Sequence, residues 1–274
     1  MMRLQCGQFR FDSDFPLIMG IVNLTPDSFS GDGLAGHVQR AIAHARRLID
    51  EGADILDIGA ESSRPGAEPT SESEELDRLL PVLSALAGCG VPISVDTYKP
   101  RVMQEAIAAG ASLINDITGF RQPGAVEVVA ASDCGVCVMH MQGEPLTMQQ
   151  QPIYDDVLAE VSAFLSHRVD ALSAAGVAAE RMVLDPGFGF GKTLEHNVLL
   201  FKNLHRLSAF GRPLLVGVSR KTMLGAITGR AVQERQPASV AAAVLAVERG
   251  AGLVRVHDVA ATKDALAVWR ALRN

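Results

Sequence analysis

The chain has 274 residues, of which 48% are hydrophobic and 20% are charged, so it can bury the core of one large α/β domain. Its net charge of −6 at pH 7, without any run of like charges, argues against a nucleic-acid-binding surface. No apolar stretch approaches the roughly 18 residues of a membrane span, residues 1–16 lack a signal-peptide pattern, and the four cysteines are scattered, so we expect a cytoplasmic protein.

Along the chain, short apolar runs alternate with helical patterns. Residues 1–16 predict a short pair of strands that covers one end of the domain. Ser71 followed by Glu74 is a capping-box pattern that opens one helix, Pro100 opens another, and Gly52 and Gly176 follow two helix ends. Strands are expected at 17–22, 53–59, 92–95, 111–114, 136–139, 182–184, 214–218 and 253–256. Helices are expected at 38–51, from 71 onward, and at 100–109, 124–131, 154–175, 194–207, 238–249 and 260–272.

This alternation of strands and helices, with short connections and no linker, predicts a (β/α)8 TIM barrel with a short N-terminal strand pair, as one domain over residues 1–274. An open doubly wound sheet is the alternative. Polar or charged residues follow the expected strands: Asn23, residues 59–66, Asp96 and Thr97, Asn115 and Asp116, His140, residues 185–187, residues 219–221, and Arg255 with His257. In a parallel barrel these residues meet at the C-terminal mouth, which makes that mouth the candidate site.

The residue types of this ring indicate what it would bind. Asp96, Asn115 and Asp185 offer acceptors and an amide group that suit a flat, donor-rich heterocycle, although each residue alone could instead cap the following helix. Three such residues around one mouth favour a binding site.

Cations and one neutral oxygen donor complete the ring. Lys221, Arg255 and His257 lie beside glycine-rich loops and favour an anion such as phosphate or carboxylate, although they could also be ordinary surface charges. Asn23 suits Mg²⁺, which keeps waters and shares phosphate oxygens of its substrates.

Some apparent motifs are discounted. Residues 31–36 match a dinucleotide fingerprint, but they do not directly follow the strand, where that fingerprint needs its first glycine. Residues 187–193 resemble a phosphate-binding P-loop, but Pro186 occupies a required glycine position. Cys134 and Cys137 have C-x-x-C spacing without a second pair, so we expect core thiols.

Several longer stretches occur in order from the first strand of the barrel to the last. They are MGIVNLTPDSFS (19–30), DIGAESSRPG (57–66), SVDT (94–97), INDI (114–117), DPGFGFGK (185–192), VSRK (218–221) and RVH (255–257). Together they resemble the dihydropteroate synthase family. The resemblance implies a (β/α)8 barrel, usually a homodimer, that joins 4-aminobenzoate to 6-hydroxymethyl-7,8-dihydropterin diphosphate in folate biosynthesis. It also implies Mg²⁺ as cofactor and sulfonamides as competitors.

The resemblance assigns roles by position. Its pterin ligands are Asp96, Asn115, Asp185 and Lys221. Its diphosphate ligands are Asn23, Ser62, Arg255 and His257, with Asn23 also on the metal. Its aminobenzoate ligands are Phe29, Arg64, Pro65, Phe190, Ser219 and Lys221. The catalytic set would be Asp96, Asp185, Lys221 and Arg255.

Departures from the family pattern are mild and lie in the loops. The chain has Gly31-Asp32-Gly33 where the family usually has Asp-Gly-Gly, and Ala60, Ser63 and Thr222 replace common Gly, Thr and Ser residues. They bear on loop flexibility and on inhibitor sensitivity. We expect residues 25–30 to form a mobile lid that carries Phe29, and we expect the glycines after it to give the loop the backbone freedom to close.

The implied chemistry needs no covalent nucleophile. Loss of diphosphate leaves positive charge on a methylene conjugated to the pterin, so a dissociative route is reasonable, and Asp96 and Asp185 would stabilise that charge. A barrel that transfers a methyl group from a reduced folate is one alternative, but it has no use for Asn23, Arg255 and His257 as diphosphate ligands. A non-catalytic pterin-binding paralogue is the other alternative, and it should lack some ring residues.

Overall fold

The computed structural model describes residues 2–24, 38–62, 68–144 and 146–273. Its strands are β1 (Met2–Cys6), β2 (Phe9–Ser13), β3 (Leu17–Asn23), β4 (Ile55–Gly59), β5 (Ile93–Asp96), β6 (Leu113–Asp116), β7 (Gly135–Met139), β8 (Met182–Asp185), β9 (Leu215–Val216) and β10 (Leu253–Val256). Its helices are α1 (Val38–Asp50), α2 (Glu72–Ala85), α3 (Pro100–Ala108), α4 (Ala125–Ala130), α5 (Val157–Ala174), α6 (Leu194–Lys202), α7 (Leu204–Leu207), α8 (Thr222–Thr228), α9 (Gln236–Glu248) and α10 (Val259–Leu272).

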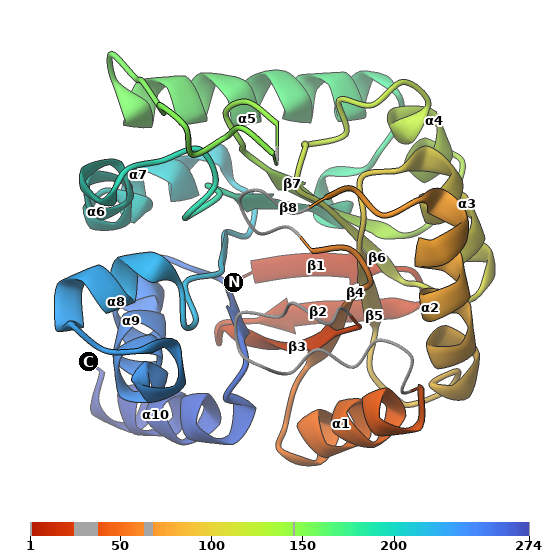
Figure 1. Ribbon diagram of the computed structural model, residues 1–274, viewed down its shortest axis with the longest axis horizontal. Coiled ribbons are helices and arrows are strands. Elements are labelled where there is room, and N and C mark those ends of the chain that lie inside the picture. Colours follow the sequence, from red (N-terminus) through yellow and green to blue (C-terminus); the bar gives the residue numbers. More distant parts are fainter. Residues whose placement is uncertain (1, 25–37, 63–67, 145, 274) are drawn as a thin grey trace.

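The predicted (β/α)8 barrel is confirmed. The parallel sheet has the strand order β8-β7-β6-β5-β4-β3-β10-β9, and helices surround it (Figure 1). A parallel bridge between Leu184 and Leu214 joins the two ends of this order, and the Leu184 N–H donates to the Pro213 carbonyl oxygen at 2.9 Å. The sheet is therefore closed, and the open doubly wound alternative is wrong. Within the described ranges, no helix combines the length and apolar character that a membrane crossing requires.

The helix boundaries differ from the predictions where polar side chains bond to the backbone. The predicted helix at 194–207 is two helices, because Asn203 leaves helical geometry while its side-chain amide donates to the Leu199 carbonyl oxygen at 2.8 Å. The helix predicted from residue 154 begins at Val157, because Asp156 caps it with side-chain bonds to two backbone N–H groups. The short helix α8, which contains Gly225, was not predicted because it is too short to give a periodic pattern.

Alternate residues of the barrel strands face the interior, and their character changes along each strand. Towards the amino ends they form one apolar cluster that includes Leu17, Met19, Ile55, Leu113, Cys137, Val183, Leu215 and Leu253. Two residues further along the same strands stand Asp57, Asn115, Asp185 and Arg255. The barrel interior is therefore apolar at one end and polar at the other, and only the polar end can act as a site.

The β1–β2 hairpin covers the apolar end of the barrel, as predicted. Leu4 and Cys6 of β1 belong to the same cluster as the interior residues. Contact is close at Gly135 of β7, where a Cβ atom would lie 3.0 Å from the Gln5 carbonyl oxygen and 3.1 Å from the Cys6 sulfur. The hairpin thus seals the interior from water on the side away from the site.

We expect Leu4→Ala to lower the free energy of unfolding by about 2–5 kcal/mol, because Leu4 is 2% exposed and its loss leaves a cavity under the barrel. Urea unfolding followed by circular dichroism measures the change. The neighbouring Arg3 has a side chain that is 77% exposed, so Arg3→Ala should stay within about 0.5 kcal/mol of the parent. Equal effects of the two substitutions would contradict the sealing role of the hairpin.

Candidate active site

A cavity of about 450 Å³ lies at the carboxyl ends of the barrel strands. Every predicted site residue that the structure describes lines this cavity: Asn23, Ser62, Asp96, Asn115, Asp185, Phe190, Ser219, Lys221, Arg255 and His257. Phe29, Arg64 and Pro65 lie outside the described ranges, as does the predicted lid at residues 25–30. Thr97, Asp116 and His140, which also follow strand ends, do not line this cavity. Most of the ring inferred from strand ends therefore surrounds one cavity, while the role of each residue stays a prediction.

Three charged groups are linked at the base of the cavity, and two of them, Asp96 and Arg255, line it. The Arg255 guanidinium donates to Asp57 through Nε at 2.5 Å and to Asp96 through Nη2 at 3.1 Å. Asp57 is fully buried and also accepts from Ser94 at 2.5 Å and from the Asn115 amide at 3.3 Å. The positive charge of Arg255 is thus offset by two carboxylates at the base of the site, where burial strengthens charged hydrogen bonds.

The predicted pterin ligands, which include Asp96, have shifted pKa values or an unsatisfied polar atom. Burial raises the pKa of Asp96 to about 7, although Arg255 opposes the rise. Burial also raises the pKa of Asp185, while Lys221 acts in the opposite direction. The Asn115 amide oxygen is buried and has no hydrogen-bond partner among the described residues. An orphaned acceptor of this kind marks a place where a ligand donor fits.

Lys221 connects the predicted pterin and aminobenzoate regions. Its ammonium group donates to the Phe188 carbonyl oxygen at 2.5 Å and lies 4.4 Å from the centre of the Phe190 ring. Burial lowers the pKa of Lys221 to about 8, and Asp185 opposes that shift. The Lys221 ammonium group thus interacts both with the buried Asp185 carboxylate and with the half-buried Phe190 ring.

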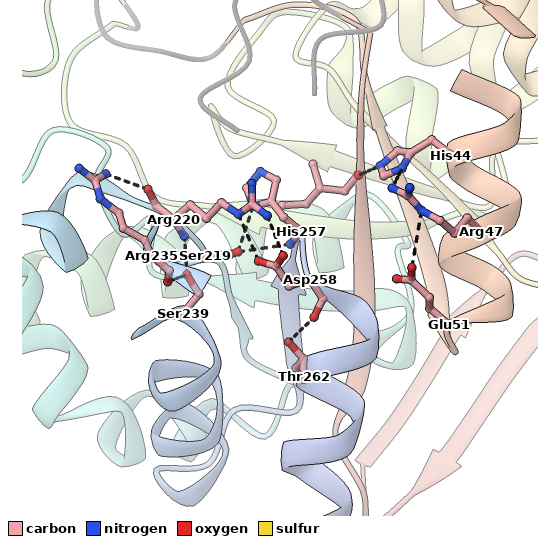
Figure 2. A network of polar contacts seen from close by, with 11 residues as sticks. His44, Arg47, Glu51, Ser219, Arg220, Arg235, Ser239, His257, Asp258 and Thr262 are labelled. Carbon is pink, nitrogen blue, oxygen red and sulfur yellow. Dashed lines mark hydrogen bonds and ion pairs between the residues drawn. The ribbon is translucent and has the colours of Figure 1, made fainter. Parts of the chain in front are cut away.

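Ser219 and His257 form a pair in the lining of the cavity (Figure 2). The Ser219 hydroxyl lies 2.9 Å from His257 Nδ1 and accepts from the His257 backbone N–H at 3.2 Å. Burial lowers the pKa of His257 to about 3, and the neighbouring Arg220 and Arg255 add to the shift. His257 is therefore neutral near pH 7 and would act on an anion as a hydrogen-bond donor, without a charge of its own.

Two residues that the sequence analysis did not assign to the site belong to it. Asp57 binds the Arg255 guanidinium. The sequence feature that could have revealed it is its place two residues after Ile55, which puts a carboxylate on the inward-facing side of the same strand. Lys192 is 3% exposed, and its Nζ lies 2.9 Å from His140 Nδ1 and donates to the Gly187 carbonyl oxygen at 2.9 Å. In the sequence Lys192 belonged to the P-loop near miss and to the stretch 185–192 but had no assigned role, and the structure shows that it ties the glycine-rich loop to the end of β7.

One wall of the cavity is held by a cluster of ionic contacts. Glu61 lines the cavity, and it accepts from Lys99 and, at 2.9 Å, from the Tyr98 hydroxyl. Lys99 also donates to the fully buried Glu75 at 2.7 Å and to the Thr70 carbonyl oxygen at 2.5 Å. These contacts fix both ends of the loop between β4 and α2 that carries Ser62.

For the cysteine pair, the structure agrees with the interpretation that it is not a metal or redox site. Cys134 and Cys137 are buried free thiols, as expected for core residues. The described residues contain no group of three or more His, Cys, Asp and Glu side chains that could hold a metal ion. The 31–36 glycines lie outside the described ranges.

Comparison with known proteins identifies the class. A family model described as pterin binding enzyme matches residues 19–257. Dihydropteroate synthase of Neisseria meningitidis serogroup C is 53% identical over 273 residues, which cover 98% of this chain and 96% of that protein. The Yersinia pestis dihydropteroate synthase structure with a sulfonamide drug complex has a TM-score of 0.95 and 46% identity, covering 98% of both chains. The Burkholderia cenocepacia dihydropteroate synthase structure complexed with 7,8-dihydropteroate has a TM-score of 0.91 and 53% identity, covering 99% of this chain and 96% of that chain.

The chain therefore belongs to the pterin-binding enzymes and, within them, to the dihydropteroate synthase family.

The buried Lys192 predicts a specific pH dependence of stability. Burial lowers its pKa from 10.5 to about 7, and Asp185 opposes the shift. Between these two values the unfolded chain holds a proton that the native protein lacks, so the free energy of unfolding gains up to about 1.4 kcal/mol per pH unit as pH rises. Below pH 7 both states are protonated and the gain is absent.

We expect Lys192→Met to remove this slope. Urea unfolding at pH 7.5, 8.5 and 9.5 should show the parent gaining stability relative to the variant as pH rises. Lys202→Met removes a lysine from the exposed face of α6 and serves as the control, with a curve parallel to the parent. Parallel curves for Lys192→Met as well would show that Lys192 is charged and well solvated.

Proposed function

We propose that this chain catalyses the condensation of 6-hydroxymethyl-7,8-dihydropterin diphosphate with 4-aminobenzoate to 7,8-dihydropteroate, with release of diphosphate, as a step of folate biosynthesis. The observation that carries the proposal is the set of Asp96, Asn115 and Asp185 in one cavity with Lys221, in which Asn115 and Asp185 are buried and Asp96 is half-buried. The family membership and the 7,8-dihydropteroate bound to the Burkholderia relative support it.

The pterin ring would lie deep in the cavity. Its ring and amino N–H groups would donate to the Asp96 and Asp185 carboxylates and to the orphaned Asn115 oxygen. The Asp57–Arg255 pair beneath fixes the orientation of two of these groups, because Arg255 binds Asp96 and the Asn115 amide donates to Asp57. The ligands would thus be held in place before substrate enters, which lowers the entropic cost of binding.

The reaction breaks the C–O bond between the pterin methylene and the diphosphate. The bonding electrons leave with the diphosphate, and the positive charge on the methylene is delocalised over the dihydropterin ring. The carboxylates of Asp96 and Asp185 would stabilise that charge. The aniline nitrogen of 4-aminobenzoate then forms the new C–N bond and releases a proton, so no nucleophile from the protein is required.

Diphosphate would bind at the mouth through Asn23, Ser62, Arg255 and His257. Neutral His257 would act as a hydrogen-bond donor. No group of three acidic, Cys or His ligands is present among the described residues, and Asn23 is a single neutral donor, so these residues fit Mg²⁺ only when substrate oxygens and waters complete its shell. Asn23 would hold the Mg²⁺, which when bound neutralises charge on the leaving diphosphate.

The 4-aminobenzoate would lie nearer the mouth. Phe190 offers a ring face and Lys221 a cation 4.4 Å from it, and Ser219 offers a hydroxyl, so a flat aromatic carboxylate fits this wall. Phe29, Arg64 and Pro65 would complete this region. Sulfonamides resemble 4-aminobenzoate in shape and charge and would compete there, which the sulfonamide complex of the Yersinia relative supports.

The purified protein mixed with dihydropterin diphosphate, labelled 4-aminobenzoate and Mg²⁺ should form labelled dihydropteroate. We expect Asp185→Asn and Lys221→Ala to lower kcat/KM by about 100-fold or more, the usual loss for one stabilising group. Asp133→Asn makes the same acid-to-amide change in an exposed position at the opposite end of the barrel and should leave turnover unchanged.

Absence of Mg²⁺-dependent product from the parent protein would defeat the synthase assignment. Near-normal turnover of a folded Asp185→Asn or Lys221→Ala protein would instead remove only that residue from its role.

We also propose a homodimer in the cytoplasm. The neighbouring helices α6, α8 and α9 each leave one large apolar side chain exposed, namely Leu199, Ile227 and Leu245, and these would be covered in a dimer. The four free cysteines fit a reducing compartment. Light scattering after gel filtration should give twice the chain mass, and Ile227→Glu should shift the protein towards the monomer. A monomeric parent protein would contradict the proposal.

A further inference from the structure

A tight turn joins β9 to α8 at the edge of the cavity. The Lys221 N–H donates to the Val218 carbonyl oxygen at 3.1 Å and closes a four-residue turn. Arg220, the third residue of this turn, has φ of 56°, and a turn of this kind normally has glycine or asparagine there. Among the described residues other than glycine, only Phe120 also has a positive φ. The backbone of Arg220 is therefore held in a conformation that an arginine disfavours.

Contacts from α9 and from the residues directly before α9 and α10 surround Arg220 (Figure 2). Its backbone N–H donates to the Ser239 hydroxyl at 2.8 Å, and its carbonyl oxygen accepts from the Arg235 guanidinium at 3.0 Å. Its side chain donates to both oxygens of Asp258, at 3.1 and 2.6 Å. Ser239 is only 3% exposed, so its hydroxyl has little water to replace this partner. Backbone and side chain of Arg220 are thus tied to the starts of α9 and α10.

The contact between the Arg235 guanidinium and the Arg220 carbonyl oxygen depends on a glycine in α8. A Cβ atom on Gly225 would lie 2.3 Å from Nη2 of Arg235, so any larger residue would displace the guanidinium from its position. Arg235 therefore reaches the Arg220 carbonyl oxygen because α8 has glycine at this point.

The residues on both sides of Arg220 line the cavity. Ser219 contacts His257, and Lys221 contacts Phe188 and Phe190. A change of φ at residue 220 would rotate the backbone that follows and move the Lys221 ammonium group away from this wall. The backbone conformation of Arg220 thus determines whether both neighbours reach the site together.

We propose that Ser239, Arg235 and Asp258 are positioning residues, which hold Arg220 in its left-handed conformation and so direct Ser219 and Lys221 into the cavity. The inference rests on the proposed function, because turnover is its readout. None of the three residues needs to touch a substrate for this role.

Two substitutions at residue 220 distinguish the effect of its backbone conformation on turnover from the effect of its side-chain charge. Arg220→Gly and Arg220→Ala both remove the side chain and every contact that it makes, but only glycine adopts a positive φ without a steric penalty. We expect kcat/KM for 4-aminobenzoate to be about 10-fold higher in Arg220→Gly than in Arg220→Ala, in line with the penalty for a left-handed alanine. A role through the Arg220 charge alone would make the two variants equal. Equal values, or a better Arg220→Ala protein, would overturn the inference.

A double-mutant cycle tests Ser239 itself. We expect Ser239→Ala to lower kcat/KM about 10-fold in the parent but less than about 3-fold in the Arg220→Gly background, where no steric penalty has to be overcome at residue 220. Gly225→Ala, which displaces Arg235, should behave in the same way. Ser162→Ala removes a comparable serine bond inside α5, from its hydroxyl to the Leu158 carbonyl oxygen at 2.6 Å, and should change nothing.

The outcomes distinguish this inference from the proposed function. A parent protein that forms no dihydropteroate would defeat the function itself. An active parent with purely additive losses for Ser239→Ala and Arg220→Gly would overturn the positioning role alone. Thermal melting of each variant checks that it is folded, and the comparison of glycine with alanine at residue 220 decides the question even if Ser239→Ala does not fold.

Discussion

Arg255 lies between Asp57 and Asp96 inside the barrel and joins strand β10 to strands β4 and β5. Burying three charges is costly, and in proteins such groups remain ionised only when short charged hydrogen bonds satisfy them. Here Ser94 and Asn115 supply additional donors to Asp57. Removing one member of such a group typically costs about 3–5 kcal/mol, because an unpaired charge stays buried. The same contacts hold Asp96 and Asn115 in the lining of the cavity, so the stability of the barrel and the geometry of the candidate site depend on one cluster.

The closed barrel explains why this cluster stands where it does. Alternate residues of each strand face the interior, and the inward-facing residues change from apolar to polar within two positions. The β1–β2 hairpin covers the apolar end, while the loops after the strands surround the polar end. Lys192 and Lys99 hold two of these loops through contacts with backbone carbonyl oxygens and buried carboxylates. Contacts of this kind join the described parts of the cavity lining to the barrel, and those of Arg220 join the turn after β9 to the starts of α9 and α10.

Local patterns in the sequence were sufficient for the elements and for most of the ring. The strand runs, the residues that cap or end helices, and the polar residues after each strand predicted a barrel and many of the described residues that line its cavity. These patterns predicted the helix boundaries less well where a side chain bonds to the backbone, as at Asn203 and Asp156. Asp57 was not recognised as part of the site because its partner, Arg255, comes from the opposite end of the chain. Lys192 was not recognised because its contacts are made with backbone atoms that only folding brings near.

The sequence by itself determined the number and order of the strands, the position of polar residues at their ends, and the family to which the motifs belong. These properties depend on local periodicity and residue type, which are readable without a fold. The tertiary structure alone decided that Arg255 is paired with two carboxylates, that His257 is neutral, that the Asn115 oxygen has no partner among the described residues, and that Arg220 is held at a positive φ. Each of these depends on burial and on groups far apart in the chain, since the pKa of a side chain and the conformation of a turn are set by what packs against them.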